Sequence, residues 1–579
     1  MKKWLFLCAV LLVSLAFLTA VASEVYAKEK LQIVGVDDDS DLGEWLEEAI
    51  INRFDEDEEW ADPLDIEIDT VRAMEAKGYY ETKVQVAIPE NEEDPPIVTI
   101  KKGPRYTISS ISIKGINGFE VRTLEVGEPL DAFSVLETQR NLAEDIQTKR
   151  CAFNLALEHQ VILDKKKNTG AVTYNVEAGA KAKFGEVSFE GAPNIDREHL
   201  YRFLAFKKGE CWSQKKIEDT KEKLLGTGLI ALIKENIPEK PAADGSVDIM
   251  FELAERAPRS IRFGLSFYTD EGPGAVAEWE HRNFHGSGEK LSAALRVNMI
   301  EQSLGAEYSK PFFLDDEDKA LNLAAKLARE ETDAYIDRGL ELSASVDNRF
   351  NKYLKGSLGV ALETTSQIDK NDNNNETTFG LFSTPISLTF DNRDSPLNPT
   401  RGFWARARAE PYFDVLGQAD PFFKTSLAAS TYFPLTSDRD LILALRGRLG
   451  SILGSGTTDV PSNKRFYAGG GGSIRGFGYQ EAGPMVNGDP AGGRSVVETS
   501  AELRYRYSET MGGVIFVDGG GAYDEVWPDF KDGYYIGAGV GFRYYTGFGP
   551  LRFDVAVPVN KRDQASAAFQ VYVSIGQAF

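Results

Sequence analysis

The chain has 579 residues, 27% of them charged, and a formal net charge of −24. So acidic a chain lacks the basic stripe that nucleic-acid binding requires, and we expect no nucleic-acid partner. No apolar run after the N-terminal segment is long enough for a membrane helix, which excludes a helical membrane protein. The length predicts several domains.

Residues 1–27 have the pattern of a secretory signal peptide. Lys2 and Lys3 precede an apolar run over residues 4–21, and Val25-Tyr26-Ala27 has small or β-branched residues at the −3 and −1 positions. We therefore expect cleavage after Ala27 and an exported mature chain. A membrane anchor is the alternative, but the apolar run is slightly short of the about 20 residues that a spanning helix needs.

Acidic side chains are concentrated in residues 37–59. The alternating acidic spacing and the glycine of a calcium-binding loop are missing there, so the segment predicts a solvated acidic surface. The four histidines show no spacing typical of a metal site or a catalytic triad. We expect no metal, no cofactor and no enzymatic activity.

Two segments of the mature chain repeat each other at an offset of 76 residues. Each contains a strand-like run, a glycine turn and an alternating strand that ends in glycine. The two glycines, Gly103 and Gly115 in one copy and Gly179 and Gly191 in the other, are twelve residues apart in both. Internal repeats of this kind indicate stacked copies of one small domain.

Three such units are expected before residue 258, with the boundaries 28–106, 107–181 and 182–257. Each is predicted to be a strand, two amphipathic helices and two further strands. Gly78 and Gly228 each follow a helical pattern, and a glycine suits the left-handed conformation after a helix C-terminus.

The predicted mature chain contains two cysteines, Cys151 and Cys211. In an exported protein they could form one disulfide, which would join the second unit to the third. Two unpaired thiols in separate domains are the alternative.

The sequence pattern changes after Pro258, where short stretches of alternating apolar and polar residues follow one another at intervals of about 20 residues. In one of them Leu291, Leu295 and Val297 share a face while Arg296 lies on the other. The same alternation with inward charges recurs in residues 402–408, 441–449 and 501–507. An apolar exterior with a polar lumen is typical of a transmembrane β-barrel.

Residues 258–579 would accommodate about 16 antiparallel strands at about 20 residues per strand and loop. The expected fold class is therefore α+β repeats followed by an all-β barrel in the outer membrane. The C-terminal residues fit a closing strand whose apolar side chains share one face: Phe569, Val571, Val573, Ile575 and Phe579.

Together these features resemble the BamA/TamA-type outer-membrane assembly factors, which join periplasmic POTRA domains to a 16-strand barrel. The resemblance covers the whole mature chain, and three POTRA units look most like the autotransporter assembly factors of the TamA type. The final strand, ending at Phe579, looks like the family's barrel-targeting signal.

The most specific resemblance is the segment Ile474-Arg475-Gly476-Phe477, which follows a glycine-rich run. It is similar to a family motif at the tip of a loop that folds into the barrel lumen. Phe516 and Asp518 resemble the family's Phe-x-Asp strand motif, and Glu502 matches an acidic residue on the preceding strand. The resemblance implies that Arg475 pairs with Glu502 and Asp518; a forked guanidinium is able to bind two carboxylates at once.

The resemblance also implies a function in assembling or translocating client proteins, autotransporters among them. Clients would pass through a lateral gate between the strands near Arg259 and Phe579, and the implied partners are unfolded clients, the lipid bilayer and a TamB-like protein anchored in the inner membrane. A passive outer-membrane channel and a two-partner-secretion-type transporter remain as alternatives. An outer-membrane enzyme is a poorer one, since no nucleophile and base stand in a suitable pattern.

Overall fold

The computed structural model describes residues 32–36, 40–51, 62–89, 96–371, 375–436, 439–531, 533–547, 549–560 and 567–575. The expected signal peptide, residues 37–39 and 52–59 of the acidic segment, and Phe579 lie outside these residues. Within them, no helix is both long and apolar enough to cross a membrane. The chain divides into two compact units, one with most of the N-terminal α/β domains and one with the barrel.

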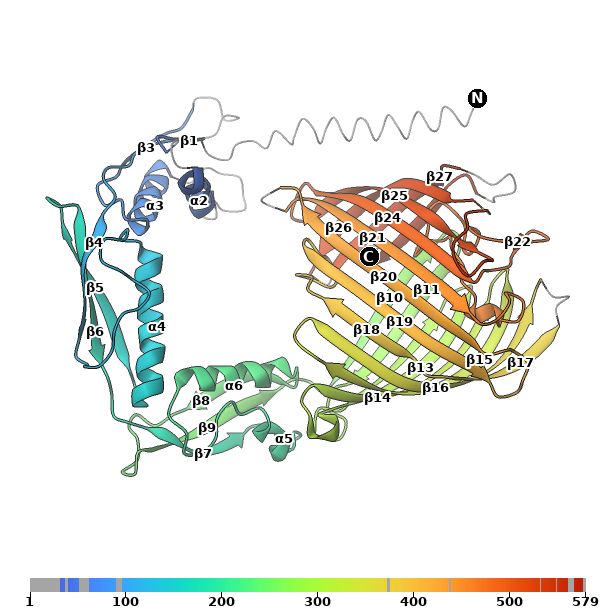
Figure 1. Ribbon diagram of the computed structural model, residues 1–579, viewed down its shortest axis with the longest axis horizontal. Helices are drawn as coiled ribbons and strands as arrows, with labels where there is room; N and C mark the ends of the chain where they lie inside the picture. The colour runs from blue at the N-terminus through green and yellow to red at the C-terminus, as the bar shows by residue number, and fades with distance from the viewer. Residues whose placement is uncertain are drawn as a thin grey trace. The chain divides into compact units, whose positions relative to one another are not determined.

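The first α/β domain is a three-stranded sheet with two helices (Figure 1). Its elements are β1 (Gln32–Val34), α2 (Ser40–Ile51), α3 (Pro63–Ala76), β2 (Lys83–Ala87) and β3 (Ile97–Lys101). The order is β1-β3-β2, with β1 parallel and β2 antiparallel to β3. Asp62 caps α3 by accepting a hydrogen bond from the backbone N–H of Leu64 at 2.9 Å, and Pro63 is the first helical residue, where its missing N–H costs nothing.

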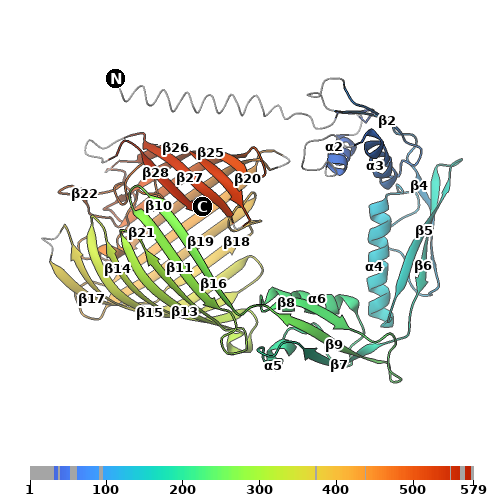
Figure 2. The ribbon, with the colours of Figure 1, turned by 180° about the vertical axis from the view of Figure 1, so that it is seen from behind.

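The second domain has the same strand order with a single helix, where two were predicted. It consists of β4 (Thr107–Lys114), α4 (Ala132–Arg150), β5 (Ala156–Asp164) and β6 (Thr169–Glu177), in the order β4-β6-β5. The segment before α4 contains Gly118, Gly127 and Pro129 among β-branched residues, a composition that disfavours a helix. Figures 1 and 2 show α4 along one face of this sheet, where Val135, Leu142 and Ile146 are buried.

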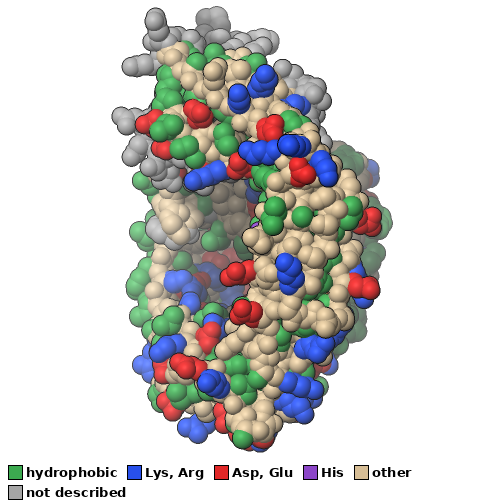
Figure 3. Space-filling view, turned by 90° about the vertical axis from the view of Figure 1, so that its left-hand side faces the viewer, with side chains coloured by type: hydrophobic (Ala, Val, Ile, Leu, Met, Phe, Trp, Pro, Cys, Tyr) green, Lys and Arg blue, Asp and Glu red, His purple; other side chains and the backbone are tan. Residues whose placement is uncertain are grey.

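The third domain contains β7 (Lys183–Glu190), α5 (Arg197–Tyr201), α6 (Gln214–Gly226), β8 (Ile230–Asn236) and β9 (Ser246–Glu255), with the strand order β7-β9-β8. A disulfide joins Cys151, at the C-terminus of α4, to Cys211 in this domain. On the face drawn in Figure 3, Lys and Arg side chains are interspersed with Asp and Glu side chains.

The remaining strands form a closed antiparallel barrel. Its strands are β10 (Arg259–Tyr268), β11 (Gly272–His281), β12 (Lys290–Val297), β13 (Glu301–Pro311), β14 (Lys319–Glu331), β15 (Tyr335–Arg349), β16 (Leu354–Asp369), β17 (Glu376–Ser383), β18 (Ile386–Asp391), β19 (Gly402–Asp414), β20 (Phe422–Pro434), β21 (Leu441–Leu453), β24 (Ser495–Arg506), β25 (Met511–Tyr523), β26 (Tyr535–Thr546), β27 (Gly549–Pro558) and β28 (Gln570–Ile575).

The barrel has 16 strand positions, as predicted. The list above names 17 strands, but β17 and β18 both pair with β16 on one side and β19 on the other, so they share one position. Pro385 separates them, and a proline has no backbone N–H to give to a β-ladder.

Side chains alternate along the barrel strands as the sequence predicts. On β10, Phe263 is 79% exposed and Leu265 is 77% exposed, as suits an exterior that contacts lipid. On β24, Glu502 is fully buried in the interior. The interior also holds an apolar cluster that includes Phe422, Phe466 and Tyr535.

Candidate functional site

Residues 454–494, between β21 and β24, form a long loop whose tip is buried inside the barrel. The loop contains a short 3-10 helix, η2 (Ser462–Lys464), and a small hairpin of β22 (Met485–Val486) and β23 (Asp489–Pro490). Ile474 is completely buried and Phe477 is 2% exposed, both in the apolar cluster of the interior. The Phe477 ring meets the Tyr535 ring edge to face at 5.4 Å, so apolar packing holds the tip on both sides of Arg475.

Arg475 lies among carboxylates, with only 2% of its side chain exposed. Its Nε and Nη2 donate to the two carboxylate oxygens of Asp518 at 2.6 and 2.9 Å, which is a bidentate pair. Its Nη1 lies 2.7 Å from Oε1 of Glu502. Its guanidinium carbon is 3.4 Å from the ring centroid of Phe516, a cation–π contact. The structure thus brings Arg475 together with the two carboxylates expected to pair with it, and adds the contact with Phe516.

Asp554, on β27, is a third carboxylate at this site, which the sequence analysis did not identify. Its Oδ2 accepts a hydrogen bond from Nη1 of Arg475 at 3.0 Å and one from Nε of Arg552 at 2.6 Å. Arg543 also pairs with Asp554, and Arg504 pairs with Glu502 at 2.7 Å. The strand alternation placed Arg504 on the inward face, and the same pattern in residues 551–555 was the available signal for Asp554.

The charges of this cluster nearly cancel. Four arginines contribute +4 and three carboxylates contribute −3, which leaves +1 for a group of residues each at most 4% exposed: Arg475, Arg504, Arg543, Arg552, Glu502, Asp518 and Asp554. Buried charges of this kind are tolerated only when they are paired and hydrogen-bonded. The arrangement can therefore fix the loop tip against β24, β25 and β27.

The backbone conformation and close packing at Gly476 favour glycine over any other residue. Its φ is +98°, and a Cβ there would lie 2.8 Å from the carbonyl carbon and oxygen of Val557. Across the contact, a Cβ on Gly537 would lie 1.8 Å from the carbonyl oxygen of Arg475. The loop tip thus approaches the backbone of β26 and β27 closely.

The barrel closes through a short seam between β10 and β28. Only Phe267 with Val573 and Tyr268 with Tyr572 are paired across it among the described residues, whereas ten residue pairs join β10 to β11. Thr269 extends the contact, because its backbone N–H donates to the carbonyl oxygen of Val571 at 3.1 Å. A pocket of 310 Å³ lies at this seam, lined by Gly264 and Leu265 of β10 and by Ser574 and Ile575 of β28, among others.

The loop tip contacts this seam directly. The hydroxyl of Tyr572 on β28 accepts a hydrogen bond from the backbone N–H of Gly476 at 3.1 Å. The ring of Tyr268 on β10 meets the Tyr572 ring edge to face, with centroids 5.6 Å apart. One side chain therefore joins the loop carrying Arg475 to the place where the barrel closes.

Comparison with known proteins identifies the barrel's family. The Omp85 superfamily domain matches residues 283–579, which is more than half of the chain and includes the loop, the charged cluster and β28. The chain belongs to the Omp85 superfamily. Omp85 membership accounts for the 16-strand barrel preceded by POTRA-like domains, and it makes this chain an outer-membrane protein whose N-terminal domains face the periplasm.

Curated relatives of this Omp85 protein include outer membrane protein assembly factors named BamA. The one from Nitratidesulfovibrio vulgaris is 23% identical over 525 residues, covering 87% of this chain and 66% of that protein. The one from Neisseria meningitidis serogroup B is 22% identical over 614 residues, covering 94% of this chain and 75% of that protein. The chain thus spans about two thirds to three quarters of the length of these relatives.

A solved structure supports the fold of this Omp85 chain. BamA from Haemophilus ducreyi lacking POTRA domains 1–3 superimposes with a TM-score of 0.68 at 19% identity, covering 81% of this chain and all of that one. The predicted resemblance to BamA/TamA-type factors is therefore confirmed at the level of the family and the fold. The narrower resemblance to TamA stays a prediction.

Proposed function

We propose that this protein is an outer-membrane protein assembly factor that inserts or exports client β-barrel proteins, autotransporters among them, through the seam between β10 and β28. The observation that carries the proposal is the short pairing of these two strands, with two register pairs among the described residues. Membership of the Omp85 superfamily and the BamA relatives support it. No catalytic step is part of the proposal.

The backbone of β10 supplies the physical reason. Residues 259–266 pair with β11 on one side, and the described part of β28 gives them no strand partner on the other. An unpaired backbone N–H or C=O facing hydrocarbon costs several kcal/mol, and a client strand that pairs with β10 removes that cost for both chains. The seam is in this way a template for the first strand of a folding barrel.

The periplasmic domains extend the proposal to client capture. Their sheets have β2, β5 and β8 at an edge, and such an edge is able to bind an extended segment by strand addition. In this proposal the edges receive unfolded clients, and the first domain docks a TamB-like protein anchored in the inner membrane.

A reversible lock on the seam tests the function. Phe267 and Val573 face each other across it, so Phe267→Cys with Val573→Cys gives a disulfide between β10 and β28. We expect the locked protein to lower the amounts of β-barrel proteins in the outer-membrane proteome, and a reductant to restore them. The matched control is Leu427→Cys with Leu449→Cys, an outward-facing pair on β20 and β21 that lies away from the seam.

The reductant would also reduce the native disulfide between Cys151 and Cys211, and it would do so in both variants. The control variant therefore shows any effect of losing that disulfide. An unchanged outer-membrane proteome in cells whose seam is fully cross-linked rejects the lateral-gate function.

A further inference from the structure

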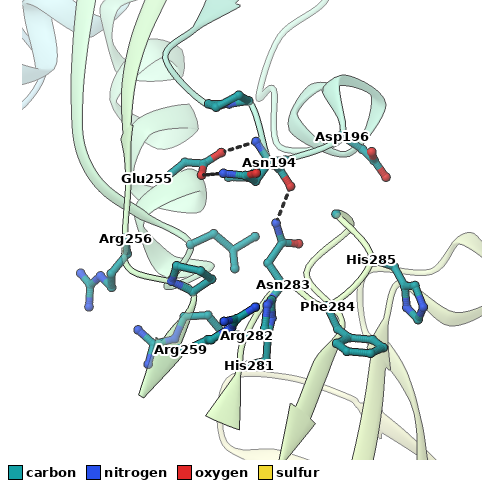
Figure 4. Close-up of a pocket in the computed structure, with 15 residues that line it drawn as sticks. Asn194, Asp196, Glu255, Arg256, Arg259, His281, Arg282, Asn283, Phe284 and His285 are labelled. Carbon is teal, nitrogen blue, oxygen red and sulfur yellow. Dashed lines mark hydrogen bonds between the residues drawn. The ribbon is translucent and has the colours of Figure 1, made fainter. Parts of the chain in front are cut away.

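A pocket of 390 Å³ opens at the end of the barrel where β10 begins and β11 ends (Figure 4). All of its lining residues belong to the compact unit that contains the barrel. This end is periplasmic, since the chain enters the barrel from the periplasmic domains at Pro258. The charged side chains and one of the histidines that line it are considered below: Arg256, Arg259, Arg282, Glu255, Asp196 and His281.

Two of the three arginines in this pocket lack a carboxylate partner. Arg256 and Arg259 are exposed, and among the described residues neither guanidinium has an ion pair or a side-chain hydrogen bond. Figure 4 shows their side chains pointing the same way, away from Phe284 and His285. Arg282 differs, because its Nη2 donates to Ser260 Oγ at 3.1 Å and to Glu280 Oε1 at 3.3 Å.

The two acidic residues of the pocket are already engaged. The carboxylate of Glu255 accepts from the backbone N–H and from Nδ2 of Asn194, at 2.7 and 2.8 Å, as Figure 4 shows. Oδ2 of Asp196 accepts from Ser287 Oγ at 2.7 Å. Nδ2 of Asn283 donates to the carbonyl oxygen of Asn194 at 2.7 Å and so helps to hold this wall in place. The donors to these two carboxylates are neutral groups, so Glu255 and Asp196 keep their charges, and with three arginines (+3) and two carboxylates (−2) the lining has a net charge of +1.

The position of Arg259 on β10 indicates where a ligand would come from. Arg259 belongs to the outward face of the strand, in register with Ile261, Phe263 and Leu265, which are 64%, 79% and 77% exposed. Its register partner on the neighbouring strand β11 is His281, and the centroid of the His281 ring lies 6.3 Å from that of the Trp279 ring. A tryptophan beside a cation at the end of an apolar outer band is typical of the level of lipid head groups.

We propose that this pocket binds the phosphate of an anionic phospholipid of the periplasmic leaflet, with Arg256 and Arg259 as its ligands. The planar guanidinium of arginine can donate two parallel hydrogen bonds to the oxygens of a phosphate, and basic pockets at the membrane surface bind lipid head groups. The volume lies within the about 300–1,000 Å³ usual for small-molecule sites. The acyl chains would lie along the apolar outer face of β10, beside the seam. A free phosphate shares the head-group chemistry but makes no use of that face.

Native mass spectrometry of the full chain released from nanodiscs tests the proposal. The nanodiscs contain phosphatidylglycerol and phosphatidylcholine in equal amounts. We expect the wild type to retain phosphatidylglycerol, and Arg256→Gln with Arg259→Gln to weaken its retention at least about tenfold, because the charge-assisted hydrogen bonds to the phosphate are lost. Arg401→Gln is the control, an exposed arginine at the same end of the barrel, directly before β19.

Four results would overturn the lipid site. They are equal retention by the double variant, an equal loss in Arg401→Gln, displacement of the lipid by inorganic phosphate, and tighter binding of a polyglutamate peptide than of the lipid. An equal loss in Arg401→Gln would indicate a general attraction of the lipid to positive charge. Displacement by inorganic phosphate would indicate a free-phosphate site, and tighter binding of polyglutamate would indicate a protein-binding surface. The faster gel mobility of the unheated barrel establishes that each variant is folded. Because client assembly is not the readout, failure here leaves the proposed function untouched.

Discussion

At the scale of single residues, Arg475 binds three carboxylates that come from three different strands. Asp518 takes two hydrogen bonds from its guanidinium, Asp554 takes one, and Glu502 lies 2.7 Å from Nη1. A lysine could not replace it, because an ammonium group has no planar fork with which to reach carboxylates on separate strands. The neighbouring arginines keep the carboxylates paired, so the cluster is a structural clamp on the loop.

Replacing Arg475 with alanine is expected to lower the free energy of unfolding of the barrel by about 3–5 kcal/mol, because it leaves buried carboxylates short of a partner. It is also expected to impair client assembly. The measurement is the urea concentration at which the fast-migrating folded form is lost on unheated gels, together with the outer-membrane proteome.

The control for this change is Arg406→Ala, which removes an exposed arginine of β19 whose Nε donates to Thr389 Oγ1 at 3.2 Å. Its cost is expected to stay within about 1 kcal/mol. If Arg475→Ala unfolds at the wild-type urea concentration and assembles clients normally, the clamp has no such role.

At the scale of elements, the loop between β21 and β24 is held by close backbone approach as well as by charge. Gly476 has a positive φ and lies against the carbonyl group of Val557, and Gly537 lies against the carbonyl oxygen of Arg475. Tyr572 accepts a hydrogen bond from Gly476 and so couples the loop to β28. A shift of the loop tip therefore changes the environment of the closing strand.

Gly476→Ala tests this approach. A Cβ in this left-handed conformation, 2.8 Å from Val557 backbone atoms, is expected to destabilise the loop by about 1–3 kcal/mol. Limited proteolysis of the folded barrel measures the effect, since a displaced loop becomes a substrate.

Gly472→Ala is a matched control within the same loop, because a Cβ there meets nothing within 4 Å. It should leave the proteolysis pattern unchanged. Equal cleavage of the two variants would show that the approach of Gly476 to β27 does not hold the loop.

At the scale of the whole molecule, the loop between β21 and β24 enters the barrel interior, and the described residues of β10 and β28 share a short seam. The apolar cluster of Ile474, Phe477, Phe466 and Tyr535 occupies the interior together with the charged clamp. A porin-like channel needs a continuous aqueous path, and the loop lies where such a path would run. The passive-channel alternative thus depends on the loop leaving the lumen.

Conductance in planar bilayers tests that alternative. We expect the full chain to show little constitutive conductance and a variant lacking residues 469–481 to show a large one. The deletion can close, because the backbone N–H of Ala482 already donates to the carbonyl oxygen of Ala468 at 2.8 Å.

Deleting residues 485–490 provides the comparison. These residues form the β22–β23 hairpin, and its flanks are also adjacent, since Ala491 N–H donates to Pro484 at 2.9 Å. Its removal should leave the conductance low. Large conductance of the intact chain would favour the passive channel instead.

Much of the architecture was predictable because it depends on local periodicity. The two-residue alternation places Glu502 and Asp518 inward and Leu295 and Val297 outward wherever the strand lies, and the glycine repeat marks the POTRA-like domains. The missing helix of the second domain was a local error, since Gly118, Gly127 and Pro129 outweigh the repeat there.

The sequence by itself determined the α/β repeats, the alternating strands and their approximate number, and its resemblance to a family motif indicated the residues at the loop tip. The tertiary structure alone decided that Asp554 joins the clamp, that Tyr572 links the loop to the seam, and that the described residues of β10 and β28 share only two register pairs. It also brought Arg256 and Arg259 to one pocket. The physical reason is that periodicity sets the face on which a side chain lies, whereas closure of the barrel sets which distant strands and loops meet on that face.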